Sequence, residues 1–463
     1  MSNRFLCIHG HFYQPPRENP FTGVIPLEHG AEPYHDFNEK ITAECYRPNA
    51  ELGNFDRVSF DVGPTLARWL EQNDPATYRR ILGADRAGGP ARNGFAQGYN
   101  HTILPLMNRR DKVTQVRWGL ADFRARFGRE PESLWLPETG ADLESLEVLA
   151  EHGLRYVILA PWQARAADLD TTQTYLIDLG GGRRIAGCFF DGALSKRVAA
   201  DAKFTRDPTI FAELCLPLRL SYAAEKRGRR QWLLVASDGE FYGHHHRGRE
   251  QFLADLLGIT APANGFALTT PSAYLDLEPP RETVALAERT AWSCYHGLDR
   301  WTVGCPCTPG DSSWKQPLRA ALDWLATAID AVGEEAASGV DFWRARDDYA
   351  RVLTAAAPVE QVVADHASGA LATAAHSRVT RLLEAQYYRQ LMFTSCGFFF
   401  EDLDRIEPKN NIAYAARAVA LVREATGDDL EPELARRLAL TRSGRNRLTG
   451  AQILRDLHTS AAS

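Results

Sequence analysis

The chain has 463 residues, of which 44% are apolar and 24% are charged, and its formal net charge at pH 7 is −6. This composition is typical of globular proteins, and the length allows a large catalytic domain with a smaller partner. The acidic balance gives no electrostatic reason to expect a nucleic acid as partner. No stretch approaches the roughly 20 apolar residues of a membrane-spanning helix, so we predict no membrane association.

The first residues, MSNRFLCIHGHFYQPP, lack the apolar core and the cleavage site of a signal peptide. The eight cysteines are scattered, and no regular pattern of pairing is evident. Scattered cysteines without a pairing pattern are typical of proteins kept in a reducing compartment. We therefore predict a cytoplasmic protein with reduced thiols.

Short apolar runs alternate with helix-like segments through the first part of the chain. The strand-like runs cover residues 5–9, 57–62, 95–100, 133–136, 156–160, 184–190, 232–236 and 266–269. The clearest helix covers residues 111–127, where apolar side chains recur at steps of three and four. This alternation predicts parallel βαβ units, and the number of strands suits an incomplete or distorted α/β barrel. Residues 19–52, rich in Pro, Gly, Asn and aromatics, are predicted to be a loop on the barrel.

After about residue 280 the sequence becomes rich in Ala, Leu, Arg and Glu with helical spacing. Helices are predicted at residues 320–332, 359–364, 376–393 and 411–426. We therefore predict a catalytic barrel domain over residues 1–280 and a mainly helical domain over 281–463. Residues 291–307, AWSCYHGLDRWTVGCPC, lie at the start of the second domain. For Cys305 and Cys307 the simplest interpretation is thiols without a metal or redox role.

Two carboxylates follow apolar strands, Glu138 after SLWLP and Asp238 after WLLVAS. The carboxyl ends of barrel strands carry the catalytic groups in this class of fold. Cleavage of a glycosidic bond with retained configuration needs a nucleophile and an acid/base about 5 Å apart. Burial beside Phe241 and Tyr242 would raise the pKa of Asp238, as a general acid requires. The alternative is that the Asp-Gly pair at 238–239 is a turn with a helix cap.

Other polar and aromatic residues accompany these acids. His9, His11 and Gln14 follow the first strand and could bind sugar hydroxyls, a metal or each other. His101 ends a later strand, and of the triplet at residues 244–246 we expect His244 to face the cleft. Aromatic rings either stack on sugars or fill the core, and those near the polar sites are Trp135, Trp162, Tyr242, Phe398 and Phe399.

Five motifs, HGHFYQPP, GYNH, WLPE, DGEFYG and SCGFFFED, occur in this order and together resemble glycoside hydrolase family 57. The resemblance covers about residues 5–425. It implies an incomplete (β/α)7 barrel followed by a helical region that helps close the active site. It also implies amylase, glucanotransferase or branching activity on an α-glucan or maltooligosaccharide, with no metal or organic cofactor. The triplet HHH and the segment WSCYHG resemble an uncharacterised branch of the family.

The motifs of the family assign roles to individual residues. By resemblance, Glu138 is the nucleophile and Asp238 the general acid/base. The first two motifs imply that His9, His11, Gln14 and His101 line the sugar-binding subsites. The last motif implies that Phe398, Phe399 and Asp402 reach the cleft from the helical domain.

Two other functions remain open from the residues alone. His9, His11, Asp238 and the histidines at 244–246 could ligate a metal in a deacetylase or mannosidase-like enzyme on a related barrel, since imidazole and carboxylate suit borderline metals. A non-catalytic glucan-binding protein would keep the aromatics and lose one carboxylate, whereas both acids are present here.

Overall fold

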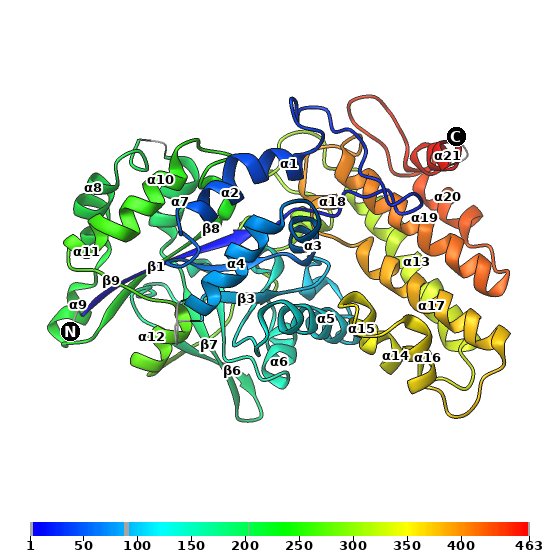
Figure 1. Ribbon diagram of the computed structural model, residues 1–463, viewed down its shortest axis with the longest axis horizontal. Helices are drawn as coiled ribbons and strands as arrows, with labels where there is room; N and C mark the ends of the chain where they lie inside the picture. The colour runs from blue at the N-terminus through cyan, green and yellow to red at the C-terminus, as the bar shows by residue number, and fades with distance from the viewer. Residues whose placement is uncertain (1–2, 88–91, 202, 462–463) are drawn as a thin grey trace. The chain divides into compact units, whose positions relative to one another are not determined.

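A computed structural model describes residues 3–87, 92–201 and 203–461 (Figure 1). The chain divides into two compact units. The barrel unit consists of Met1–Gln14, Leu27–Gln97 and Arg126–Glu288, and the helical unit of Pro15–Pro26, Gly98–Ala125 and Arg289–Ser463. This division differs from the predicted single boundary at residue 280, because two earlier segments pack with the C-terminal helices.

Parallel strands form the centre of the barrel unit. In ring order they are β1 (Arg4–Phe12), β2 (Ser59–Val62), β3 (Gly94–Gln97), β4 (Leu134–Trp135), β5 (Tyr156–Leu159), β7 (Arg183–Phe189) and β8 (Gln231–Asp238). The strands pair in the order β4-β3-β2-β1-β8, and β5 pairs with β7. In Figure 1, β1 and β8 lie side by side along their lengths.

Two single contacts complete this ring of strands. Ser133, just before β4, forms an isolated parallel bridge with Tyr156 of β5. The amide of Asp191, just after β7, donates to the Leu234 carbonyl of β8 at 2.7 Å. A ring joined by continuous pairing on one side and by isolated contacts on the other is an incomplete barrel. The predicted (β/α)7 fold class is therefore confirmed.

One strand was not predicted from the sequence. β6 (Tyr175–Gly180) runs antiparallel to β7 and carries β10 (Glu282–Val284) at its outer side, while β9 (Ala267–Leu268) pairs with the start of β1. The turn between β6 and β7 is Gly180-Gly181-Gly182, and all three residues have positive φ. A glycine run between two apolar segments is a hairpin signal, since glycine adopts positive φ without steric cost.

Helices surround these strands in the barrel unit. They are α1 (Phe37–Ile41), α2 (Arg47–Glu51), α3 (Pro64–Asn73), α4 (Pro75–Ala87), α6 (Leu143–Glu151), α7 (Gly192–Ala200), α8 (Pro208–Ile210), α9 (Tyr222–Lys226), α10 (Arg249–Asp255), α11 (Ala261–Ala263) and α12 (Pro271–Leu277). The prediction of a loop over residues 19–52 was wrong at its end, where α1 and α2 form. Asp36 caps α1 by accepting from the amides of Asn38 and Glu39, and an aspartate at this position is a signal for the start of a helix.

The helical unit is built around long helices. They are α5 (Arg109–Phe127), α13 (Lys315–Ala336), α14 (Phe342–Asp348), α15 (Ala350–Leu353), α16 (Val359–Asp365), α17 (Thr373–Leu391), α18 (Cys396–Phe399), α19 (Ile406–Thr426), α20 (Glu431–Leu438) and α21 (Gly450–Ala461). The last two residues of α5, after Ala125, belong to the barrel unit. Helices α17 and α19 lie side by side, and α13 packs against both (Figure 1). None of the helices in the described part of the chain combines enough length with enough apolar character to cross a membrane.

A buried ion network explains why α5 belongs to the helical unit. The Asp111 carboxylate of α5 pairs with Arg346 of α14 at 2.8 Å and with Arg389 of α17 at 2.5 Å. Gln390 donates to the same carboxylate at 2.8 Å. Because buried charges are tolerated only when they are paired, these side chains fix α5 against α14 and α17.

Candidate active site

Strands β1, β2 and β8 bring polar residues together at their carboxyl ends. In the parallel pairing, His9 lies opposite Ser59, and His11 lies opposite Asp61 on one side and Asp238 on the other. Side chains two positions apart in a strand point to the same face. His9 and His11 therefore share a face with the residues that they meet across the sheet.

One carboxylate joins the two histidines. His9 Nε2 is 3.2 Å from Asp61 Oδ1, and His11 Nδ1 is 2.8 Å from Asp61 Oδ2. A carboxylate accepts from both, so both imidazoles donate. His9 Nδ1, 2.9 Å from Ser59 Oγ, is then free to accept from that hydroxyl. These contacts fix the tautomer of His9 and the ring orientation of both histidines.

The two imidazoles differ in charge. Burial lowers the pKa of His9, and the Asp61 carboxylate only partly opposes this effect. For His11 burial acts in the same direction, but the negative charges of Asp61, Asp238 and Glu240 outweigh it and raise the pKa of His11 to about 9. At neutral pH the site therefore holds a neutral imidazole next to an imidazolium.

Trp135 packs on both histidines. Its ring stacks on His9 with centroids 4.8 Å apart and on His11 with centroids 5.0 Å apart. Only 1% of Trp135 is exposed. The residue was predicted to bind substrate, but this burial gives it a supporting contact with the histidines instead of a surface for a sugar.

A chain of hydrogen bonds reaches a second acid beside Asp238. Gln14 Nε2 donates to Tyr46 Oη at 2.9 Å, and the Tyr46 hydroxyl donates to Glu240 Oε1 at 2.6 Å. The amide of Tyr13 donates to the same oxygen at 3.3 Å. Burial raises the pKa of Glu240, while the bond from Tyr46 opposes the rise. Gln14, predicted to bind substrate, thus orients the tyrosine that holds Glu240.

Asp238 ends β8 and keeps part of its surface accessible to solvent. Burial, together with the charges of neighbouring acids, raises the pKa of Asp238 to about 7. Burial is the largest cause, the His11 cation opposes it, and the charges of Glu240, Glu138 and Asp61 add to it. A carboxyl group that is protonated near neutral pH can act as a general acid.

Glu138 lies in a strained turn after β4. Its φ is 57° and that of the next residue, Thr139, is 47°. This left-handed region costs about 1–2 kcal/mol for each residue that has a Cβ atom. Such strain persists where the surroundings enforce it and is found often at functional sites. The side chain of Glu138 is partly exposed, and its charge is one of those that raise the pKa of Asp238.

Gln163 holds this turn in place. Its Oε1 accepts from the Thr139 hydroxyl and from the Ala160 amide, both at 2.9 Å, and its Nε2 donates to the Thr139 carbonyl at 2.8 Å. Gln163 is completely buried. It therefore connects the turn after β4 to the end of β5 and supports the conformation that carries Glu138.

Three further predicted residues lie in the barrel unit. Trp162 is partly exposed and meets the Phe190 ring edge to face at 6.0 Å. Tyr242 is buried, and its backbone carbonyl accepts from Asn49 Nδ2 at 2.6 Å, which is a structural contact. His244 is partly exposed, and its Nδ1 lies 2.6 Å from Glu44 Oε2. Sugar contacts by Trp162 and His244 stay predictions.

The remaining predicted residues belong to the helical unit. His101 is buried with a φ of 54°, and its Nδ1 lies 2.6 Å from Ser395 Oγ. Phe398 lies in the core of the unit, and the Phe399 ring lies 4.3 Å from the Arg300 guanidinium. Asp402 is buried and accepts from the amides of Asp404 and Gly444, both at 3.0 Å. These contacts are structural within that unit, and a role at a sugar-binding site stays a prediction.

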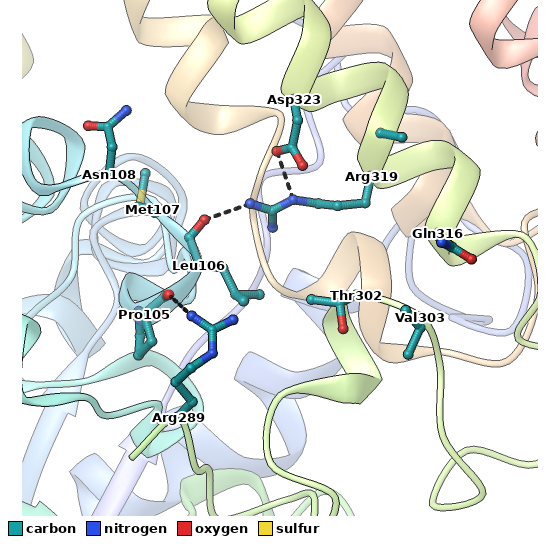
Figure 2. Close-up of a pocket in the computed structure, with 11 residues that line it drawn as sticks. Pro105, Leu106, Met107, Asn108, Arg289, Thr302, Val303, Gln316, Arg319 and Asp323 are labelled. Atoms are coloured by element: carbon teal, nitrogen blue, oxygen red, sulfur yellow. Dashed lines mark hydrogen bonds and ion pairs between the residues drawn. The ribbon is translucent and has the colours of Figure 1, made fainter.

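A separate pocket of about 560 Å³ lies within the helical unit (Figure 2). Arg289 donates to the Pro105 carbonyl at 2.9 Å, and Arg319 donates to the Leu106 carbonyl at 2.8 Å. Arg319 also pairs with Asp323 at 2.9 Å. Figure 2 shows both guanidinium groups directed at these oxygens. The lining contains neither of the acids predicted to be catalytic, so the barrel site is the better candidate.

Four residues of the site were missed from the sequence: Asp61, Glu240, Tyr46 and Gln163. Asp61 had a signal, because in SFDV the polar residues at 59 and 61 alternate with apolar ones. Glu240 stands inside DGEFYG, where Asp238 alone was chosen. Tyr46 and Gln163 carry no local signal, since their partners are distant in sequence.

Two segments of the chain match known family models. Residues 95–287 match the family model described as Glycosyl hydrolase family 57. The predicted resemblance to this family is confirmed. Residues 311–462 match a second model, described as Domain of unknown function (DUF3536).

Curated relatives match part of the chain. An alpha-amylase of Pyrococcus abyssi is 26% identical over 167 residues, 35% of this chain and 24% of the relative. A 4-alpha-glucanotransferase of Thermococcus litoralis is 26% identical over 154 residues, 32% of this chain and 23% of the relative. The match thus spans about a quarter of the length of these relatives.

Solved structures share the fold over most of the chain. An exo-type maltose-forming amylase from Pyrococcus sp. ST04 gives a TM-score of 0.79 at 14% identity, covering 94% of this chain and 83% of the other. A GH57-type branching enzyme from Pyrococcus horikoshii gives 0.64 at 14% identity, covering 99% and 95%. At these identities the likeness concerns the fold.

Gln163→Leu should destabilise the protein and disturb the turn that carries Glu138. The leucine leaves the buried Thr139 and Ala160 groups unpaired, and each such group costs about 1–3 kcal/mol. We expect the free energy of unfolding in urea to fall by roughly 2–4 kcal/mol. Gln251→Leu, at an exposed position of α10, is the matched control and should change little. An unchanged urea midpoint for Gln163→Leu would contradict the role given to this residue.

Asp238→Asn should alter the pH dependence of stability. The unfolded carboxyl has a pKa of about 3.9 and the folded one about 7. The folded state therefore binds the proton more tightly, and wild-type stability falls as pH rises through this window. Asparagine does not titrate, so the melting temperature of the variant relative to wild type should be higher at pH 8 than at pH 5. Asp168→Asn, at an exposed site, should give the same difference at both pH values.

Proposed function

We propose that the protein is a retaining glycoside hydrolase or transglycosidase that acts on α-glucans. The observation that supports this most is electrostatic: Asp238, whose pKa is raised to about 7, interacts with the charges of both Glu138 and His11. The relatives and neighbours whose names describe amylase, glucanotransferase and branching activity support the substrate class.

The proposed reaction has two steps. In the first, the Glu138 carboxylate attacks the anomeric carbon while the Asp238 carboxylic acid donates its proton to the glycosidic oxygen, so the leaving sugar departs with that proton. In the second, the Asp238 carboxylate takes a proton from water or from a sugar hydroxyl. The oxygen of that water or hydroxyl then attacks the anomeric carbon, and Glu138 leaves as a carboxylate. Two inversions at this carbon give net retention.

The histidine pair has an electrostatic part in this proposal. Asp61 holds the His11 imidazolium beside β8, where it stabilises the Asp238 carboxylate that forms when the proton is donated. Neutral His9 donates to the other oxygen of the Asp61 carboxylate and so helps to hold this acid in place. The network thus favours the charge that develops during the first step.

The metal-dependent alternative receives less support from the donor set. Both ring nitrogens of His9 are already engaged, one by the Ser59 hydroxyl and the other by Asp61, so neither is left for a metal. Among the described residues, the group of potential ligands that converge closely enough for one ion lies in the helical unit.

We also propose a cytoplasmic location, since all eight cysteines are free of disulfides and reduced thiols persist in reducing compartments.

Removing either acid should abolish the reaction. Glu138→Gln and Asp238→Asn should each lower kcat on maltooligosaccharides by about 10²–10⁴-fold or more, because each step needs both groups. Glu213→Gln and Asp168→Asn, at exposed positions of the same unit, should keep wild-type rates. The first product, observed by NMR, should have the α configuration of the substrate. Near wild-type turnover by either acid variant, or an inverted product, would refute the assignment.

The pH at which activity falls should shift in opposite directions in the variants His11→Asn and Glu240→Gln. Wild-type activity should fall above about pH 7, where Asp238 loses its proton. The His11 cation lowers the pKa of Asp238, so His11→Asn should shift this fall to higher pH. The Glu240 charge raises the pKa of Asp238, so Glu240→Gln should shift the fall to lower pH. Profiles of kcat/KM against pH test both signs, and shifts in the same direction would contradict the proposed acid.

A further inference from the structure

The helical unit contains a long segment that has little regular structure. Between Ala291 and Trp314, which the structure describes in full, the chain forms a single short helix, η10 (Asp299–Trp301). Segments of this length without helices or strands are uncommon inside compact domains. Ala291, Leu298, Trp301 and Trp314 are nevertheless buried in the core of the unit. Something must hold this segment, which we call the 291–314 loop, in one conformation.

Four metal-binding side chains converge within this loop. Cys294, His296, Cys305 and Cys307 each offer one ligand atom, and all four atoms lie within 4.8 Å of one another. Cys294 Sγ is 3.4 Å from Cys305 Sγ, and Cys307 Sγ is 3.3 Å from His296 Nδ1. A tetrahedral zinc ion with Zn–S bonds of about 2.3 Å separates its sulfur ligands by about 3.8 Å. The observed spacing therefore suits one such ion.

The ligands form two pairs, Cys-x-His and Cys-x-Cys, each presented by a turn. Gly297, just after the first pair, has a φ of 72°, and Gly304, just before the second, has a φ of 89°. A side chain at Gly304 would also meet Ser312, so the backbone passes too close there for any residue but glycine. The two pairs are thus brought to one point by backbone turns that glycine permits.

Buried positive charge lies beside the four ligands. Arg300 donates to the Cys307 carbonyl at 3.3 Å, and the Lys315 ammonium donates to the Arg300 carbonyl at 3.0 Å. Neither cation forms an ion pair with a carboxylate in the part of the chain that the structure describes. Three thiolates on a divalent ion leave one net negative charge, which one of these cations is enough to balance.

We propose that Cys294, His296, Cys305 and Cys307 bind one zinc ion, which fixes the 291–314 loop to the core of the helical unit. Three cysteines and one histidine fill all four positions of a tetrahedral site, which is the pattern of structural zinc. The pair Cys305 and Cys307, interpreted from the sequence as thiols without a metal, gains two further ligands through the fold. The proposal is independent of the glycosidase assignment.

The metal content of the wild-type chain tests this directly. The protein is purified with zinc present, and its zinc is measured by elemental analysis, with about one ion per chain expected. Removal of zinc by a chelator should lower the melting temperature, and added zinc should restore it. Cobalt(II) added to the stripped protein should give the strong visible absorption of tetrahedral thiolate coordination.

Variants locate the ion. Cys305→Ser and His296→Ala should lose the zinc and the cobalt absorption, whereas Cys396→Ser and His376→Ala, in the same unit, should keep both. Wild-type protein that binds neither zinc nor cobalt, or that contains a disulfide between Cys294 and Cys305, would overturn the proposal. The cobalt titration of the wild-type chain decides the matter even if a cysteine variant fails to fold. Glucan cleavage plays no part in these measurements, so their outcome is separate from that of the proposed function.

Discussion

The Asp61 carboxylate, shared between two imidazoles, is the interaction on which the barrel site depends. It sits on β2 opposite His11 of β1, and each of its oxygens accepts from one histidine. Burial lowers the pKa of His9 and keeps this imidazole neutral, although Asp61 opposes the effect. The same carboxylate, together with Asp238 and Glu240, raises the pKa of His11, which is therefore an imidazolium. The charge pattern of the site follows from the register of three parallel strands.

Several acids close to one another would repel if all were ionised. The structure relieves this repulsion unequally, through the His11 cation and through the hydrogen bond from Tyr46 to Glu240. Burial and the charges of Glu240, Glu138 and Asp61 raise the pKa of Asp238 to about 7, although the His11 cation opposes them. Environments that push the pKa values of neighbouring acids apart are what acid/base chemistry requires. The strained conformation at Glu138, supported by Gln163, is consistent with the same role.

The helical unit uses polar contacts to join segments that are distant in sequence. Asp111 connects α5 to α14 and α17 through two buried arginines. In the 291–314 loop, Cys294 and His296 meet Cys305 and Cys307 across an irregular segment. In both places, polar groups that require a defined geometry add to apolar burial, which is non-directional.

The sequence alone determined the fold class, because strand and helix periodicities and the order of five motifs are local properties of the chain. It also selected Glu138, Asp238, His9 and His11, since polar residues stand out directly after apolar strands. The tertiary structure decided what these residues contact. It showed Asp61 between the histidines, Trp135 buried against them and Gln14 bonded to Tyr46. It also assigned residues 98–125 to the helical unit and brought Cys294 and His296 to Cys305 and Cys307. Each of these depends on which distant segments meet, and local patterns do not encode that information.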